Sequence, residues 1–231
     1  MLFTNKKATQ LNINIDGTVI ERVKEFKSLG LLIDENLNFK AHCQKINNKL
    51  SKANYILNKN KSFLNLKSKM LLYNSLAAPH ILYNRAIWGS APECHLKKVQ
   101  IAQNKIIRNI IYNPLSSTKD KFKFLGILNV SQIHEHQCIC YIFKMNNNMC
   151  PELIIQSVEN NQFYHQYNTR NKALKRPQFL LAISQRAISY KGITFWNSLP
   201  IEIREKNCPV AAFSNLIKKK KTFIHRHESP T

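Results

Sequence analysis

Sequence patterns that form strands are confined to residues 1–36. LNINI and TVIERV alternate apolar and polar residues on either side of Asp16-Gly17, a strong signal for a hairpin turn. The stretch EFKSLGLLIDENLNFKAH then predicts a third strand over Phe26–Ile33, a turn at Asp34 and the start of a helix. Because only helical patterns follow, we predict a mainly α fold with a small antiparallel hairpin or meander at its N-terminus.

Apolar residues then recur every three or four positions, the spacing of amphipathic helices. Asn38 is expected to cap the first helix. A second helix is predicted to begin near Leu66, to be kinked or ended by Pro79, which lacks a backbone N–H, and to close at Gly89. The apolar stripe of the first helix consists of Phe39, Cys43, Ile46, Leu50, Ala53 and Leu57.

A third helix, predicted over about 93–112, has two unlike faces. On a wheel of ~100° per residue, its aliphatic residues cover one side. Its basic residues gather within about a quarter-turn on the opposite side. Such a stripe either follows the phosphates of a nucleic acid or is an ordinary solvated face, and the pattern leaves both open. The basic residues are Lys97, Lys98, Lys105 and Arg108.

The charge balance points to a polyanionic partner. With 35 basic and 13 acidic residues the net charge is +22, which favours nucleic acid ahead of a membrane surface. The 27 lysines and 27 asparagines share A-rich codons, so base composition is an alternative source of the lysines. The six cysteines form no CxxC pair, and the sequence shows neither a secretory signal nor an apolar run of ~18 residues. We therefore expect an intracellular protein, nuclear or cytoplasmic, with reduced thiols and no membrane partner.

The acidic residues form no evident catalytic set. A two-metal phosphoryl-transfer site needs clustered carboxylates. The only adjacent pair, Asp34-Glu35, stands at the predicted strand-to-helix turn, where Asp34 more naturally helps form the turn. The sequence also lacks the G-x-x-x-x-G-K-[ST] and G-x-S-x-G motifs. We expect no catalysis, no cofactor and no small-molecule substrate.

The stretch HEHQCIC is the most metal-like part of the sequence. His134 and Cys138 are four residues apart, as are His136 and Cys140, so on a helix each pair could supply two zinc ligands. The two pairs point ~200° apart, however, and a closed zinc site needs four ligands. The alternative is a core helix with small buried thiols and no metal.

Residues 157–178 are polar and are predicted to form a flexible linker. Tyr164 and Tyr167 lie near Arg170 and Lys172 in this segment. Exposed aromatic and basic side chains suit stacking on single-stranded nucleic acid. The alternative is loose attachment of these aromatic rings to the core.

The stretch that begins at Glu25 resembles the segment of non-LTR (LINE-type) retrotransposon reverse transcriptases that leaves the palm and enters the thumb. A pattern like [FY]-K-x-L-G-[VI]-x-[IL]-D-x-x-L-x-[FW]-x-x-H recurs in that family, and Leu31 departs mildly from it. Three later stretches are similar to family segments that follow in the same order. They are MLLYNSLAAPHILYNRAIWG, VQIAQNKIIRNI, and YNTRNK with RAISYKGITFWNSLPIEIR. The resemblance therefore covers essentially the whole chain. The first pattern is carried here by Phe26, Lys27, Leu29, Gly30, Leu31, Ile33, Asp34, Leu37, Phe39 and His42.

This resemblance implies a division of the chain. Residues 1–36 are a palm remnant with a primer-grip-like hairpin, and 37–125 are a helical thumb. An additional helix lies within 126–156, and after the linker a smaller C-terminal region, 179–231, ends in a basic helix.

The resemblance also implies functional residues. The Leu-Gly strand belongs to the family's primer grip, which assigns Phe26, Leu29 and Gly30 to nucleic-acid binding. The family's three metal-binding aspartates lie upstream of Met1, so we expect no polymerisation by this chain alone. The implied partner is a template–primer duplex or RNA. A stand-alone nucleic-acid-binding module, a helical protein-interaction domain and a non-functional gene remnant stay open as alternatives.

Overall fold

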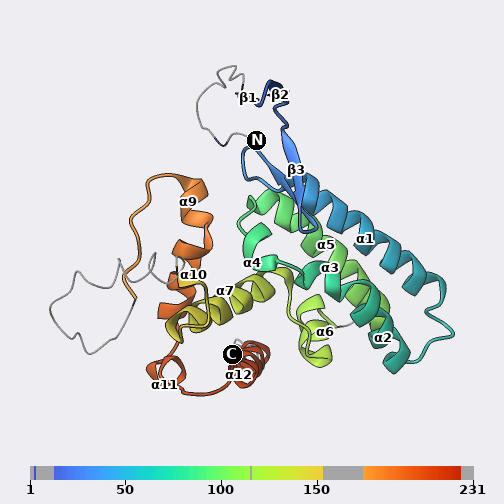
Figure 1. The fold of residues 1–231 in the computed structure, drawn as a ribbon. Helices are drawn as coiled ribbons and strands as arrows, with labels where there is room; N and C mark the ends of the chain where they lie inside the picture. Colours follow the sequence, from blue (N-terminus) through green and yellow to red (C-terminus); the bar gives the residue numbers. More distant parts are fainter. Residues whose placement is uncertain (1–2, 4–12, 115, 153–173, 225–231) are drawn as a thin grey trace.

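The fold is taken from a computed structural model that describes residues 3, 13–114, 116–152 and 174–224 (Figure 1). Four short strands pair as two antiparallel hairpins and precede a helical region, which confirms the predicted fold class. The strands are β1 (Ile13–Ile15), β2 (Thr18–Ile20), β3 (Glu25–Ser28) and β4 (Leu31–Asp34). The helices are α1 (Lys40–Lys59), α2 (Leu66–Leu76), α3 (Ala78–Leu82), α4 (Arg85–Trp88), α5 (Glu93–Ile110), α6 (Thr118–Leu125), α7 (Val130–Asn146), α9 (Ala182–Arg186), α10 (Ile188–Asn197), α11 (Ile201–Arg204) and α12 (Val210–Ile224).

The single strand predicted over residues 26–33 is two strands, so that prediction is wrong. Leu29 and Gly30 have φ angles of 44° and 84°, and the chain reverses there so that Ser28 pairs with Leu31. A two-residue hairpin turn of type I′ needs positive φ at both central residues, which Asn-Gly or Asp-Gly normally supplies. Because the first turn position holds leucine (Leu29), the sequence pattern does not indicate this turn.

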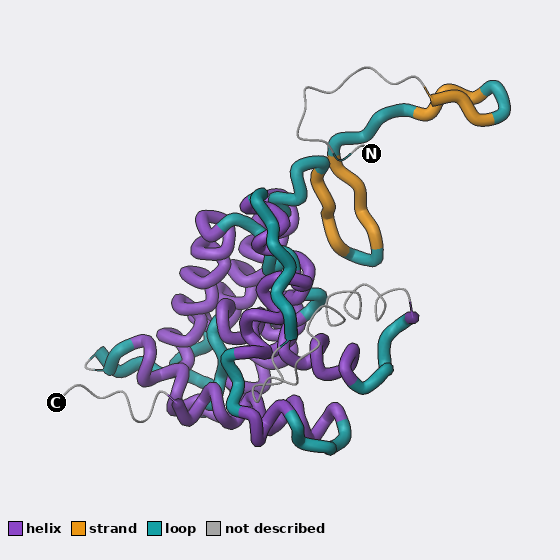
Figure 2. The backbone as a smooth tube through the Cα atoms, turned by 90° about the vertical axis from the view of Figure 1, so that its left-hand side faces the viewer, coloured by secondary structure: helices purple, strands orange, loops and turns teal. Residues whose placement is uncertain are grey.

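The two hairpins differ in their support. β1–β2 stands away from the helices, and all of its side chains are exposed (Figure 2). β3–β4 instead contacts α1 through β4, where Leu31 is buried. The second hairpin is therefore held by the helical core, whereas the first projects from it.

Helix α1 begins differently from the prediction. Its N-cap residue is Phe39, with φ 50° and no side-chain cap bond, so the expectation that Asn38 caps the helix is wrong. The Asp34 carboxylate accepts hydrogen bonds from the backbone N–H groups of Asn36 (3.1 Å), Asn38 (3.0 Å) and Phe39 (2.6 Å). A carboxylate close to a helix start also interacts favourably with the helix dipole. The expectation that Asp34 forms the turn is confirmed.

The first apolar core forms around α1 and α5, and the whole predicted stripe of α1 is buried in it. A polar side chain also lies inside this core. Gln103 is fully buried, and its Nε2 donates to Tyr73 Oη and to the Leu128 carbonyl oxygen, both at 3.0 Å. These bonds satisfy the amide and connect α5 to α2 and to the residues that lead into α7.

The second predicted helix is divided into α2, α3 and α4. Pro79 lies in the first turn of α3, where its missing N–H costs little. Gly89 closes α4 as predicted, and a methyl group there would overlap the His134 ring and the Arg85 carbonyl oxygen. Glycine at this position therefore lets α4 pack closely against α7.

Helix α7 contributes to two apolar cores (Figure 1). Val130 and Ile133, at its start, belong to the core around α1 and α5. Its later residues pack against α10 and α12, where Phe143 stacks on Phe213 with 3.9 Å between ring centroids. A single helix thus joins the core around α1 and α5 to the C-terminal helices.

The HEHQCIC residues lie on opposite sides of α7. His134 and Cys138 are buried, and His134 Nδ1 donates to the Arg85 carbonyl oxygen at 3.1 Å. His136 Nε2 instead donates to the Ser214 carbonyl oxygen of α12 at 3.0 Å. Within the described ranges, no group of three or more His, Cys, Asp and Glu side chains could hold a metal ion. No helix in the same ranges is both long and apolar enough to cross a membrane.

Candidate nucleic-acid interface

The four basic residues singled out on the third predicted helix are all exposed on α5. Lys97 Nζ lies 3.4 Å from the Glu93 carboxylate, and Arg108 Nε donates to Thr118 Oγ1 at 3.0 Å. An exposed ion pair one helical turn apart contributes little stability, so Lys97 is easily released for another anion.

Lys98 and Lys105 line a shallow groove of about 230 Å³ between α1 and α5. Asn47, Ser51 and Asn54 of α1 face them across this groove. The two lysines are seven residues apart, about 10 Å along the helix axis. The groove therefore combines two cations on one wall with amide and hydroxyl groups on the other, and we call it the α1–α5 groove.

A second hollow of about 280 Å³ continues from the α1–α5 groove, because Lys98 lines both. Lys40 and Gln44 of α1, His95 of α5 and Glu25 of β3 line this second hollow. Glu25 directly precedes Phe26. The two hollows thus meet at Lys98 and extend from Lys105 to Glu25, the first residue of β3.

The tip of the β3–β4 hairpin presents apolar side chains to solvent. Leu29 is 86% exposed and Phe26 is 56% exposed. The hydroxyl of Tyr83 donates a hydrogen bond to the Leu29 carbonyl oxygen, and the Tyr83 ring lies 3.4 Å from where a side chain on Gly30 would begin. The hairpin tip is therefore anchored to the segment between α3 and α4 while its leucine points outward.

The histidine of the family-like pattern has a structural role. The Leu32 backbone N–H donates to His42 Nδ1 at 3.4 Å, and the His42 ring packs edge-on against Trp88 with 5.7 Å between centroids. Burial, assisted by the charge of Lys45, lowers the pKa of His42 to about 4. His42 is consequently a neutral acceptor that ties β4 to α1.

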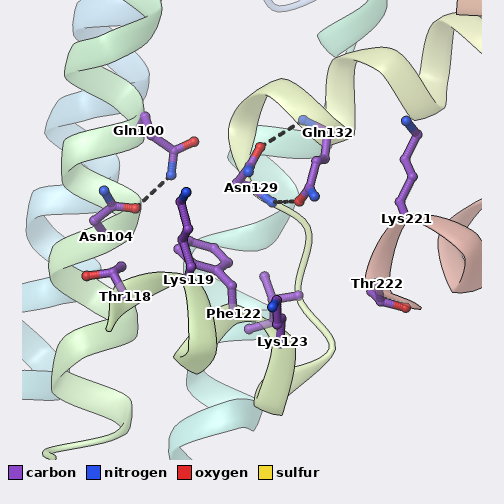
Figure 3. A pocket seen from close by; sticks show the side chains of 11 residues that line it. Gln100, Asn104, Thr118, Lys119, Phe122, Lys123, Asn129, Gln132, Lys221 and Thr222 are labelled. Atoms are coloured by element: carbon purple, nitrogen blue, oxygen red, sulfur yellow. Dashed lines mark hydrogen bonds between the residues drawn. The ribbon is translucent and has the colours of Figure 1, made fainter. Parts of the chain in front are cut away.

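A separate pocket of about 230 Å³ lies between α5, α6, α7 and α12 and carries Lys119, Lys123 and Lys221 (Figure 3). Several of its polar side chains already have partners. Gln100 donates to Asn104 at 2.7 Å, and Lys221 Nζ lies 2.5 Å from Glu135. This pocket offers less to a ligand than the exposed α1–α5 groove does.

The structure thus brings Lys98, Lys105 and Glu25 of the β3–β4 hairpin to two adjoining hollows, and Phe26, Leu29 and Gly30 line neither of them. Tyr164, Tyr167, Arg170 and Lys172 lie outside the described residues, so their predicted binding role stays a prediction. Sequence reasoning missed two contributors to the candidate interface. One is Tyr83, and the other is the wall of polar α1 residues that faces the lysines across the α1–α5 groove. The signal for the wall was the spacing of Asn47, Ser51 and Asn54, which places three small polar side chains beside the apolar stripe.

Comparison with known proteins finds polymerases of mobile elements. The chain is 33% identical over 111 residues to a probable RNA-directed DNA polymerase from transposon X-element of Drosophila melanogaster, an alignment covering 47% of this chain and 12% of the relative. It is 30% identical over 113 residues to the RNA-directed DNA polymerase from mobile element jockey of Drosophila funebris, with the same coverages of 47% and 12%.

A third similar protein is the probable RNA-directed DNA polymerase from transposon BS of Drosophila melanogaster, 29% identical over 102 residues that cover 42% of this chain and 11% of the relative. No family model and no solved structure matches. The chain spans about an eighth of the length of these curated relatives, with 12% covered in the first two. These similarities confirm the resemblance to non-LTR retrotransposon reverse transcriptases that the motifs indicated.

Proposed function

We propose, from this similarity to RNA-directed DNA polymerases of mobile elements, that the chain is the palm-end, thumb and C-terminal part of a reverse transcriptase and that it grips template–primer nucleic acid. The observation that carries the proposal is the pair of hollows that meet at Lys98 and extend from Lys105 to Glu25 at the base of the β3–β4 hairpin. The excess of 35 basic over 13 acidic residues suits the same partner.

The α1–α5 groove has the chemistry for a phosphate backbone. Lys98 and Lys105 are about 10 Å apart along the helix axis, close enough for both to contact phosphates of one strand. The amides of Asn47 and Asn54 and the hydroxyl of Ser51 supply uncharged donors beside them. Such contacts position a backbone without reading its sequence.

The hairpin suits the end of a primer. Phe26 and Leu29 offer apolar side chains to a sugar or base, and the positive φ of Leu29 keeps its side chain at the exposed tip. A bulky residue in this conformation costs about 1–3 kcal/mol and is most often kept where it serves a function. By resemblance to the family, we assign Phe26, Leu29 and Gly30 to positioning the primer terminus.

The salt dependence of binding tests the proposal. Replacing Lys97, Lys98, Lys105 and Arg108 together by Gln should weaken duplex binding and flatten the slope of log K against log salt by about three to four units. Sequence preference should not change, because phosphate contacts carry no base information. Fluorescence anisotropy with a random duplex at several salt concentrations measures both quantities.

A matched variant controls for net charge. Lys45, Lys49, Lys52 and Lys59 are exposed on α1 and do not line the groove, so their replacement by Gln removes the same charge elsewhere. This control variant should keep most of the slope of log K against log salt. If the two fourfold variants lose affinity equally, the α5 face is an ordinary solvated surface, and a protein-interaction role is favoured over nucleic-acid binding.

A further inference from the structure

A cavity of about 500 Å³ lies where α4, α5 and α7 meet α9 and α10. It is lined on one side by Arg85, Lys97 and His134 and on the other by Arg186 and Lys191. Its volume lies in the range of small-molecule sites in proteins. Lys98 and Lys105, which line the α1–α5 groove, do not line this cavity.

Arg85 carries an unpaired buried charge into this cavity. The side chain is 0% exposed, its Nε donates to the Val130 carbonyl oxygen at 3.2 Å, and its guanidinium lies 4.0 Å from the centre of the Trp88 ring. Its Nη1 is buried and has no hydrogen-bond partner in the described part of the chain. Burial lowers the pKa of Arg85 to about 10, which still leaves it charged at neutral pH. A buried cation without an anion is costly, so this geometry favours binding of one.

A second arginine also has a buried nitrogen without a hydrogen-bond partner in the described part of the chain. Arg186, at the end of α9, lines the cavity, and its buried Nε has no hydrogen-bond partner among the described residues. Lys191 of α10 adds a third cation from another element. Of the described residues around the cavity, only Glu93 has a carboxylate, and that group is 80% exposed and already pairs with Lys97. The cavity therefore has a surplus of positive charge.

Two helix starts reinforce this surplus. Val130 and Ser131 in the first turn of α7, and Ala91 just before α5, line the same cavity. Helix N-termini carry partial positive charge and stabilise anions nearby. Arginine, lysine and helix-terminal charges thus act in the same direction on one cavity.

We propose that this cavity, the Arg85 cavity, is a binding site for a phosphate group. A guanidinium donates paired N–H groups to phosphate oxygens, and a tetrahedral phosphate has enough oxygens for Arg85, Arg186 and Lys191 together. The phosphate belongs either to free inorganic phosphate or to the 5′-phosphorylated end of a nucleic acid. The chemistry of recognition is the same for both.

Thermal unfolding tests the site directly. The chain is compared in sodium phosphate and sodium chloride at equal ionic strength and pH 7. At a phosphate concentration about five times the dissociation constant, the parent's Tm should rise by about 2–4 °C relative to chloride. Arg186→Gln and Lys191→Gln should lose that rise. These two positions carry the test because they are partly exposed, whereas replacing buried Arg85 can unfold the chain.

Arg176→Gln is the matched control. Arg176 is exposed just before the C-terminal region, its guanidinium lies 5.1 Å from the Tyr190 ring, and it does not line the cavity. The Arg176→Gln variant should keep the full phosphate-dependent rise in Tm. An equal rise in Tm in the parent and in Arg186→Gln, or no rise in Tm in the parent, would overturn the proposal.

Two oligonucleotides of one sequence, with and without a 5′-phosphate, separate the possible sources. If the ligand is a nucleic-acid end, the parent should bind the 5′-phosphorylated strand about tenfold more tightly, and Arg186→Gln should bind both alike. A variant with Gln at Lys98 and Lys105 alone, neither of which lines the cavity, should keep the difference between the two strands. If phosphate raises the parent's Tm but both strands bind alike, the site takes free phosphate.

Discussion

The carboxylate of Asp34 accepts a hydrogen bond from the backbone N–H of Phe39, with 2.6 Å between Oδ2 and N. Asp34 ends β4 and Phe39 immediately precedes α1, so this one bond joins the hairpin to the first helix. Its other oxygen accepts from Asn36 and Asn38. Together with the Leu32–His42 and Tyr83–Leu29 hydrogen bonds, the Asp34 side chain therefore fixes the β3–β4 hairpin relative to the helices.

Asp34→Ala should lower the free energy of unfolding by about 2 kcal/mol or more, because it removes a charged acceptor from three backbone donors. Urea unfolding followed by circular dichroism measures this change. Glu35→Ala is the neighbouring control. It breaks only the partly exposed ion pair with Arg22, where Oε2 and Nη2 are 2.9 Å apart, and should cost about 0–1 kcal/mol. Equal losses in the two variants would contradict the role assigned to Asp34.

Acid should destabilise the chain through two buried histidines. Burial lowers the pKa values of both His42 and His134 to about 4, from an ordinary value of 6.5. The unfolded chain therefore takes up protons first, and stability is fullest above pH 6.5 and falls as pH drops toward 4. Between pH 7.5 and 5 the expected loss is up to about 2 kcal/mol for each histidine.

Urea unfolding at several pH values measures that loss. His42→Gln should remove about half of the pH dependence that the two histidines contribute. His95→Gln provides a control, since His95 lines the second hollow and is not among the buried residues. A variant lacking His42 with the parent's full pH dependence would show that His42 is not buried as a neutral acceptor.

Gly89→Ala should destabilise the fold by about 1–3 kcal/mol or more, because the added methyl group meets the His134 ring and the Arg85 carbonyl oxygen. Gly126→Asn gives the contrast. Gly126 has φ 62° and nothing within 4 Å of an added side chain, and Asn tolerates this conformation. Differential scanning calorimetry should show a clear fall in Tm for the first variant and a small one for the second. The opposite order would mean that α4 and α7 are not closely packed.

Amide hydrogen exchange should divide the chain at the end of the hairpins. Residues 13–34 should exchange faster than α1 and α5, because β1–β2 has no side chain in a core and a two-stranded hairpin is marginal in water. Mass spectrometry of peptic fragments measures the rates. Measurement at two protein concentrations controls for self-association through the open strand edges. Strand amides as protected as those of α1 would show that another segment or partner completes the sheet.

The purified chain of 231 residues should not extend a primer with Mg²⁺ or Mn²⁺ on any template. Its 13 acidic residues are dispersed in the sequence, and metal-dependent phosphoryl transfer needs clustered carboxylates. A gel assay of a labelled primer measures extension. A mock preparation from the same expression host controls for contaminating polymerase. Extension above this control would contradict the expectation.

Much of the helical architecture could be predicted because its signals are local. The stripe from Phe39 to Leu57 is buried as predicted, and the basic residues of α5 are exposed as predicted. A helix repeats every 3.6 residues, so the spacing of apolar residues by itself reveals which face is buried. The Asp16-Gly17 turn was equally readable, since this dipeptide suits positive φ angles.

The features that matter most for the proposed sites depend on contacts between distant residues. Leu29-Gly30 becomes a turn that is held by Tyr83, and Asn47, Ser51 and Asn54 become a groove wall only when α1 packs beside Lys98 and Lys105. Arg85 looks in the sequence like an ordinary surface arginine, yet the packing of α4 against α7 buries it at a cavity that Arg186 also lines. The sequence by itself determined which residues form helices and which faces are apolar, because periodicity needs only neighbours. Only the tertiary structure decided which charged groups share a cavity, because burial and loss of solvent are properties of the packed chain.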